Sequence, residues 1–176
     1  SLLFGPDGTQ LAAYRKIHLF DVDIAGQVSV RESDTRAPGD EPVLAHTALG
    51  GIGMTICYDL RFPELYRRLA LAGAHMLVVP AAFTFPTGAA HWEVLLRARA
   101  IENQCWVVAA NQHGIGMGGV ANYGNSMVVD PWGTVVARTG SDRDDVVCAE
   151  VDPALLDRVR TQLPALRHVR LVDGGR

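Results

Sequence analysis

One stretch constrains the fold of this chain more than any other: residues 51–72, GIGMTICYDLRFPELYRRLALA. Alternating apolar residues at its start predict a buried strand over residues 52–56. Pro63 supplies the fixed φ favoured in the first turn of a helix, and apolar residues at helical spacing continue to Gly73, a C-terminal stop. Cys57 lies between the two elements. The pattern therefore predicts a strand, a sharp turn and a helix, a geometry that lifts one side chain above a sheet and toward a cleft.

The position of Cys57 favours nucleophilic chemistry. Backbone N–H groups after such a turn are free to donate to a developing oxyanion, and the positive end of the following helix favours a thiolate. A thiol at its ordinary pKa is mostly protonated at neutral pH, so it needs a base or a cationic neighbour. A buried structural cysteine is the alternative, and the local pattern alone does not decide between the two.

Four motifs carry a resemblance to a known family. In chain order they are YRKIHLFD from Tyr14, CYDLRFPE from Cys57, HWEVLLRARAIE from His91 and SMVVDPWG from Ser126. Their order, and the spacing between Lys16 and Cys57, resemble the nitrilase superfamily of carbon–nitrogen hydrolases and its Nit-type amidase branch. The resemblance extends from about Tyr14 to about Arg170, which is nearly the whole chain.

The resemblance implies the fold class. The family folds as a four-layer α-β-β-α sandwich with mixed β-sheets, and we expect this α/β chain to be the C-terminal part of one. Strands that alternate with helices, together with several hairpins, also favour a mixed α/β sheet. We expect residues 1–176 to form a partial domain that lacks the N-terminal part of the sandwich. Residues 164–176 are expected to form an extended C-terminal arm.

The resemblance also assigns catalytic roles. Cys57 matches the family's nucleophile, and Lys16 matches the lysine that stabilises the oxyanion of the tetrahedral intermediate. The backbone N–H of Tyr58 matches the second oxyanion donor. The family's general-base glutamate lies before the lysine motif, and no Glu precedes Lys16 in this chain. We therefore expect two of the three catalytic groups here and no appreciable amidase activity from the chain alone.

Three further residues are candidates for the substrate pocket. Glu32 matches an auxiliary glutamate that lines the pocket in this branch, and a solvated loop acid is the alternative. Phe83 and Thr84 follow a predicted strand end, where α/β folds collect their substrates, and the family uses this loop to line the pocket. We expect no cofactor and no metal, because the six histidines show no metal-ligand spacing.

Local patterns predict the remaining elements. We expect a strand over residues 11–19 that carries Lys16, followed by a polar loop over residues 21–40. A loop of small residues is expected over residues 81–90, and a helix over residues 91–104. Asp152 is expected to cap a last helix, with Pro153 at its first position.

The chain contains three cysteines with no C-x-x-C spacing, so neither a disulfide framework nor a zinc site is indicated. We expect Cys57 to be the most reactive thiol. Cys105 and Cys148 are expected in buried strands, for Cys148 over residues 146–151, and buried thiols are typically inert. A reducing cytoplasm suits unpaired cysteines best.

Composition limits the partners. A net charge of −3 without a basic run does not indicate a nucleic-acid partner. No stretch reaches the roughly 18 apolar residues of a membrane span. We expect a small-molecule amide as substrate, and the association seen in the family implies a homodimer or a larger homo-oligomer.

The leading hypothesis is an amidase in which Cys57 attacks a small amide and ammonia leaves. An ω-amidase or another nitrilase-branch amidase is the nearest alternative. A Cys-His acyl transferase or glutaminase is less favoured, because nucleophile turns of that kind commonly read G-x-C-x-G, whereas Tyr58 and Asp59 follow Cys57 here. The third hypothesis is a non-catalytic chain that only folds or assembles with a partner.

Overall fold

The computed structural model describes residues 1–25, 28–116 and 119–171. A six-stranded mixed sheet in the order β12-β11-β8-β7-β6-β5 forms its centre. The strands are β5 (Val43–Thr47), β6 (Gly50–Met54), β7 (Ala74–Ala81), β8 (Trp106–Asn111), β11 (Met127–Val129) and β12 (Val135–Arg138). β6, β7 and β8 run parallel to one another, and the outer strands pair antiparallel. The expected α/β fold with a mixed sheet is confirmed.

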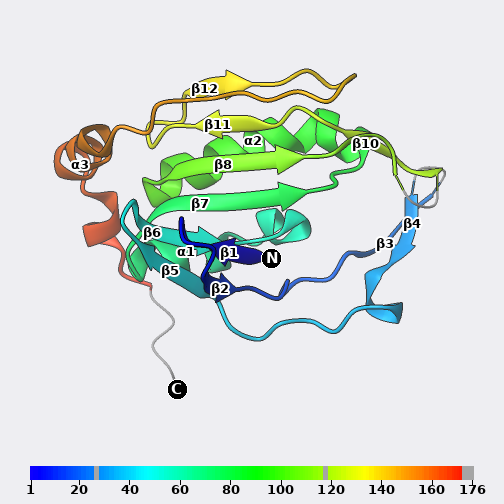
Figure 1. Cartoon of the computed structure of the whole chain (residues 1–176), viewed down its shortest axis with the longest axis horizontal. Helices are drawn as coiled ribbons and strands as arrows, with labels where there is room; N and C mark the ends of the chain where they lie inside the picture. Colours follow the sequence, from blue (N-terminus) through cyan, green and yellow to red (C-terminus); the bar gives the residue numbers. More distant parts are fainter. Residues whose placement is uncertain (26–27, 117–118, 172–176) are drawn as a thin grey trace.

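Two helices cover one face of the sheet, as Figure 1 shows behind the strands: α1 (Pro63–Leu71) and α2 (Phe85–Asn103). The core lies between these helices and the sheet, where Tyr66, Leu77 and Trp92 are fully buried. A third helix, α3 (Pro153–Gln162), and the 3₁₀ turn η4 (Ala165–His168) lie at the end of the sheet from which β7 and β8 start.

Three two-stranded hairpins complete the described structure. They are β1 (Leu2–Phe4) with β2 (Gln10–Ala13), β3 (Asp21–Ile24) with β4 (Val28–Arg31), and β9 (His113–Ile115) with β10 (Ala121–Tyr123). The first hairpin lies in front of the β5–β6 end of the sheet in Figure 1, whereas the other two lie beyond the carboxyl ends of β7 and β8.

The predicted strand, turn and helix around Cys57 are confirmed. β6 ends at Met54, the 3₁₀ turn η2 (Cys57–Arg61) follows, and α1 begins at Pro63. Gly73 terminates the helix with φ of 106°, a left-handed conformation that glycine adopts without steric cost. The cap of the last helix is also confirmed, because Asp152 Oδ1 accepts a hydrogen bond from Ala154 N at 2.8 Å.

Two predictions in the N-terminal third are wrong. The strand predicted over residues 11–19 ends at Ala13, because the backbone around Lys16 bonds to a side chain and to a loop instead of a neighbouring strand: His18 N donates to Asp59, and Lys16 O accepts from Gly39 N. The loop predicted over residues 21–40 contains the β3–β4 hairpin and the 3₁₀ turn η1 (Glu32–Asp34). Strands of four residues give too little alternation to be recognised in the sequence.

Two further predictions are also wrong. α2 begins at Phe85 instead of residue 91, because Pro86 is accommodated in its first turn and Thr84 precedes it as N-cap. Residues 146–151 form no strand, because this apolar run pairs with no neighbouring strand, and Val146 is 84% exposed. Cys148 is consequently exposed, not buried.

Some expectations remain predictions. The described residues form one six-stranded sheet with helices on one face, besides the three hairpins, so they do not test the four-layer arrangement. The 3₁₀ turn at Ala165–His168 falls in the predicted arm over residues 164–176, of which residues 172–176 lie outside the described part. None of the helices among the described residues combines the length and apolar character needed to cross a membrane.

Candidate active site

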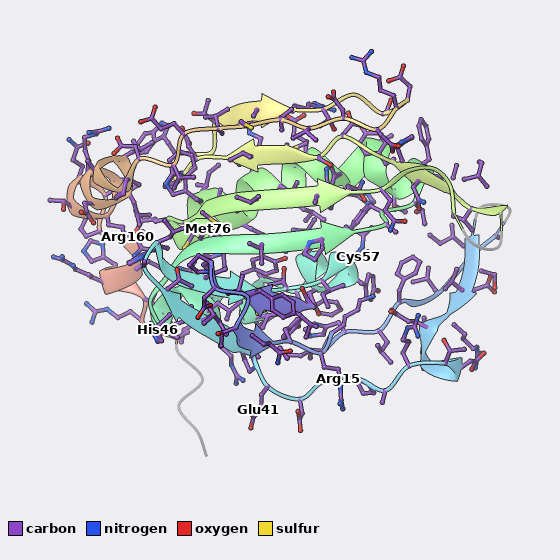
Figure 2. All side chains as sticks on the ribbon, viewed as in Figure 1. Arg15, Glu41, His46, Cys57, Met76 and Arg160 are labelled. Atoms are coloured by element: carbon purple, nitrogen blue, oxygen red, sulfur yellow. The ribbon has the colours of Figure 1, made fainter. Side chains whose placement is uncertain are left out.

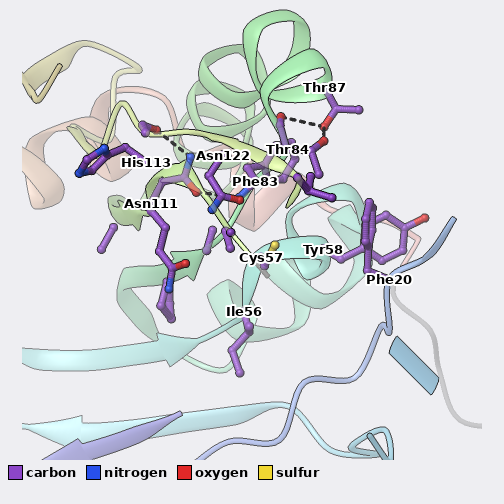
Figure 3. A pocket seen from close by; sticks show the side chains of 18 of the residues that line it. Phe20, Ile56, Cys57, Tyr58, Phe83, Thr84, Thr87, Asn111, His113 and Asn122 are labelled. Carbon is purple, nitrogen blue, oxygen red and sulfur yellow. Dashed lines mark hydrogen bonds between the residues drawn. The ribbon is translucent and has the colours of Figure 1, made fainter. Parts of the chain in front are cut away.

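A cavity of about 970 Å³ opens at the carboxyl ends of the parallel strands, between the β3–β4 and β9–β10 hairpins. In Figure 3, Cys57 lies in the middle of the labelled residues, with Tyr58 and Phe20 on one side and Asn111 and His113 on the other. Small-molecule sites in open α/β sheets form at this edge. All six predicted site residues line the cavity: Lys16, Glu32, Cys57, Tyr58, Phe83 and Thr84.

The backbone at Cys57 is unusual. Its φ is +48°, in the left-handed region that residues with a Cβ seldom adopt. Strained backbone of this kind is found preferentially at active sites, because the surrounding fold must hold it in place. Tyr58 follows in the first turn of η2, where N–H groups lack an intrahelical partner. The turn therefore presents a thiol and an N–H donor side by side.

The protonation of Cys57 reflects opposing effects. Burial raises the pKa of the thiol and is the largest effect, whereas the Lys16 charge and a backbone hydrogen bond from Ala82 lower it. The charges of Glu32 and Asp59 raise the pKa further. The net effect raises the pKa of Cys57 and so disfavours the thiolate that the helix end alone favours, which means that the thiol needs a base to act as a nucleophile.

Lys16 and Glu32 form an ion pair inside the cavity. Lys16 Nζ lies 2.5 Å from Glu32 Oε2, and their side chains are 10% and 24% exposed. The same Glu32 oxygen accepts a hydrogen bond from Phe20 N at 2.8 Å. Glu32 therefore lies in the cavity wall and is paired with Lys16, whereas its role in the site stays a prediction.

The segment that carries Lys16 packs closely against Gly39. Gly39 N donates to Lys16 O at 2.8 Å. A Cβ at Gly39 would lie only 2.3 Å from the Arg15 carbonyl oxygen, which no side chain can accommodate without a backbone shift. This close approach and the hydrogen bond fix the main chain at Arg15 and Lys16.

Asp59 is the site residue that the sequence did not reveal. Its carboxylate is fully buried and accepts four hydrogen bonds, from Tyr14 Oη, His18 N, His18 Nδ1 and Ile56 N, at 2.7, 3.1, 2.9 and 2.9 Å. Tyr14 and His18 belong to the lysine motif, and Ile56 precedes Cys57. The sequence shows an Asp in a motif, but it does not show that the carboxylate is buried or what it binds.

The strands β7 and β8 supply the opposite wall. Asn111 Oδ1 accepts a hydrogen bond from Phe83 N at 2.8 Å, and Asn111 Nδ2 donates to Gly124 O at 2.7 Å. Thr84 Oγ1 bonds Thr87 Oγ1 at 2.7 Å at the start of α2, as Figure 3 shows. Asn111 thus fixes the pocket loop through its backbone, a role that sequence reasoning also missed.

Arg61 borders the cavity at the end of the turn that begins with Cys57. Its guanidinium lies over the Tyr58 and Phe83 rings, at 5.9 and 5.1 Å from their centroids. Its Nη1 also lies 3.3 Å from His91 Nδ1. Among the described residues, no group of three or more His, Cys, Asp or Glu side chains could hold a metal ion.

The carbon–nitrogen hydrolase family matches residues 1–161, and the chain therefore belongs to this family. The deaminated glutathione amidase of Mus musculus is 52% identical over 96% of this chain and 52% of its own length. This chain thus spans about half the length of the curated relatives it matches.

Solved structures agree with the family assignment. The Caenorhabditis elegans NitFhit protein has a TM-score of 0.89 at 48% identity, over 96% of this chain and 41% of that one. Saccharomyces cerevisiae Nit3, a member of branch 10 of the nitrilase superfamily, has a TM-score of 0.82 at 36% identity, over 93% and 56%. A mutant of the Nesterenkonia sp. AN1 amidase, with acrylamide added at its active-site cysteine, has a TM-score of 0.70 at 29% identity, over 93% and 60%.

Proposed function

We propose that this chain carries the nucleophile and the oxyanion-binding groups of an amidase that hydrolyses a small amide and releases ammonia. One observation carries the proposal: a cysteine on a left-handed turn lines a cavity together with a nearly buried lysine. The covalent adduct at the active-site cysteine of the similar Nesterenkonia amidase supports the assignment of Cys57.

In the proposed reaction, Cys57 Sγ attacks the amide carbon, and its proton passes to a base. The negative charge that develops on the carbonyl oxygen is stabilised by the Lys16 ammonium and the Tyr58 N–H. The base returns the proton to the leaving nitrogen, the carbon–nitrogen bond breaks, and ammonia departs from a thioester. Water then attacks the thioester, the carboxylic acid leaves, and the Cys57 thiol is restored.

Lys16 is not the base in this scheme. A deprotonated lysine would lose the charge that the oxyanion needs, and Glu32 already engages the ammonium at 2.5 Å. We propose that the general base is a glutamate on a segment that precedes Ser1, as the resemblance to the family implies. Residues 1–176 are then a partial domain of the complete enzyme.

We propose a substrate like that of the deaminated glutathione amidases, a small amide with a peptide-like tail. The cavity volume of about 970 Å³ fits such a molecule. An ω-amidase or another nitrilase-branch amidase is the alternative, and a panel of amides separates these. We further propose that the complete protein is a cytoplasmic homodimer or larger homo-oligomer to which residues 164–176 contribute as an arm.

One observation favours a test of the alternative Cys-His mechanism. His113 lines the cavity, and its Nε2 lies 2.8 Å from Asp144 Oδ1. A histidine base held by a carboxylate is a common partner of a nucleophilic cysteine. His113→Ala should leave turnover largely intact in our scheme and abolish it in the Cys-His scheme.

The test uses a form extended N-terminally to the length of its relatives. Ammonia release from a panel of small amides is measured for the wild type and for Cys57→Ala, and a trapped thioester is located by peptide mass spectrometry. We expect turnover and a thioester at Cys57 only in the wild type. Turnover that survives Cys57→Ala would overturn the proposal, and so would the absence of turnover with every amide.

A further inference from the structure

The two halves of the proposed oxyanion site come from distant parts of the sequence. Lys16 lies on an irregular segment after β2, and Cys57 lies on η2 after β6. No strand pairing connects these two segments in the described structure. Their relative position must therefore depend on other contacts, and three hydrogen bonds from the lysine segment meet at one side chain of the cysteine turn.

That side chain is Asp59, whose hydrogen-bond partners flank Lys16 on both sides and directly precede Cys57. Two residues before Lys16, Tyr14 Oη donates to Asp59 Oδ2 at 2.7 Å, and two residues after it, the His18 N–H and Nδ1 bond Asp59 Oδ1. One residue before Cys57, the Ile56 N–H donates to Asp59 Oδ2 at 2.9 Å. One carboxylate thus holds the lysine segment and the cysteine turn at the same time.

We propose that Asp59 is the positioning residue of the site, whose buried carboxylate sets the distance between the Lys16 ammonium and the Cys57 thiol. The inference rests on the proposed function, because it concerns the same two residues. Asp59 does not line the cavity, so it acts through the groups that it binds and not by contact with a substrate.

The surrounding contacts support a rigid arrangement. The Tyr14 hydroxyl keeps its proton, because burial and the hydrogen bond to Asp59 raise the pKa of Tyr14 far above its ordinary value. The same hydroxyl accepts a hydrogen bond from Ile17 N at 3.3 Å. The His18 ring stacks on Phe62 with a centroid distance of 3.6 Å and an interplanar angle of 6°. Both side chains that donate to Asp59 are therefore themselves held in place.

The charge of Asp59 and its positioning of Lys16 have opposite expected effects on the alkylation rate of Cys57. The Asp59 charge disfavours the thiolate, whereas the nearby Lys16 charge favours it. Replacing Asp59 with the isosteric Asn removes a charge, which by itself would speed alkylation of Cys57. A slower alkylation in Asp59→Asn therefore reports a displaced Lys16 and not the lost charge.

The test is a double-mutant cycle read by the rate of iodoacetamide labelling at Cys57 in the folded chain, at one fixed pH. We expect Asp59→Asn to slow labelling, and we expect it to have no slowing effect in a Lys16→Ala background, because the two changes then act through one interaction. Asp130→Asn is the matched control. Asp130 is also buried and accepts backbone hydrogen bonds from Trp132 and Thr134 in a turn outside the cavity.

Tyr14→Phe is a second, milder variant that keeps the ring in the core and should slow labelling less than Asp59→Asn does. Cys105 must stay unlabelled in every variant, which shows that the fold is retained. If Asp59→Asn does not slow labelling, or slows it equally with and without Lys16, the positioning role is wrong. If Asp59→Asn does not fold, unchanged labelling in Tyr14→Phe overturns the proposal instead. Neither labelling experiment depends on amide turnover, so a failure of the positioning role can be distinguished from a failure of the proposed function.

Discussion

Two cysteine–cation pairs lie at opposite ends of the same sheet, at Cys57 and near Arg160 in Figure 2. Cys57 has Lys16 as its cationic neighbour, whereas the Cys105 sulfur lies 3.3 Å from Arg160 Nη2. Burial raises the thiol pKa at both ends, to about 11 for Cys105, and the cation lowers it at both. Electrostatics alone would therefore not separate a reactive cysteine from a structural one.

The surroundings of the two pairs differ. Arg160 donates to the carbonyl oxygens of Ala74 and Gln104 at 2.7 and 3.0 Å, and Cys105 donates to Ala74 O at 3.2 Å. Neither member of that pair lines the cavity, whereas Lys16 and Cys57 both do. The comparison teaches that a cation beside a thiol makes a candidate site only where a cavity gives a substrate access to both.

The largest expected effect is that of Lys16→Ala in the N-terminally extended form. The loss of one oxyanion donor should lower kcat by about 10²–10³-fold. The Michaelis constant should change far less, because the interaction is made mainly in the transition state. Ammonia release under steady-state conditions measures both constants, with Arg160→Ala as the cation control. A wild-type kcat in Lys16→Ala would remove the lysine from the mechanism.

Arg160→Ala should act on stability instead. It leaves the carbonyl groups of Ala74 and Gln104 without their charged donor, at a cost of about 1.5–3 kcal/mol in the free energy of unfolding. Urea denaturation of the chain measures this cost. The labelling rate of Cys57 without denaturant should equal that of the wild type. A slower rate would mean that the two ends of the sheet are coupled.

Gly39→Ala should disturb the lysine segment through the backbone. A Cβ placed 2.3 Å from the Arg15 carbonyl oxygen forces a shift of the kind that costs about 1–3 kcal/mol, and Cys57 labelling should slow because Lys16 moves. Gly8→Ala is the control for backbone strain without a steric clash, because its φ of +81° disfavours alanine while no atom lies within 4 Å of the added Cβ. Equal labelling rates in the two variants would show that the close approach at Gly39 does not fix Lys16.

The smallest expected effect is a shift in the pH dependence of Cys57 alkylation. Burial raises the pKa of Cys57, so the rate should keep rising with pH beyond the ordinary titration range of a thiol. Lys16 lowers the Cys57 pKa, so Lys16→Ala should move the profile to higher pH. Labelling followed from neutral to alkaline pH measures both profiles. A shift to lower pH would contradict the assigned sign.

The sequence predicts the strand, turn and helix around Cys57 because those elements follow from local periodicity and from Pro63 and Gly73. It also places Lys16, through the resemblance, in the same cavity. It misses the roles of Asp59 and Asn111, because a buried polar side chain is defined by its partners in space. It wrongly buries Cys148, because an apolar run becomes a strand only when its backbone pairs with a neighbouring strand, and local periodicity does not show whether such pairing forms.

The most direct measurement is the rate at which acrylamide, an amide-bearing reagent, adds to each of the three cysteines of the folded chain. Peptide mass spectrometry over a time course gives each rate, and the same measurement with a thiol reagent that lacks an amide group corrects for exposure. We expect the corrected rate to be highest at Cys57 and lowered by Lys16→Ala, with no adduct at Cys105. A corrected rate at Cys105 or Cys148 that equals or exceeds the Cys57 rate would contradict the account.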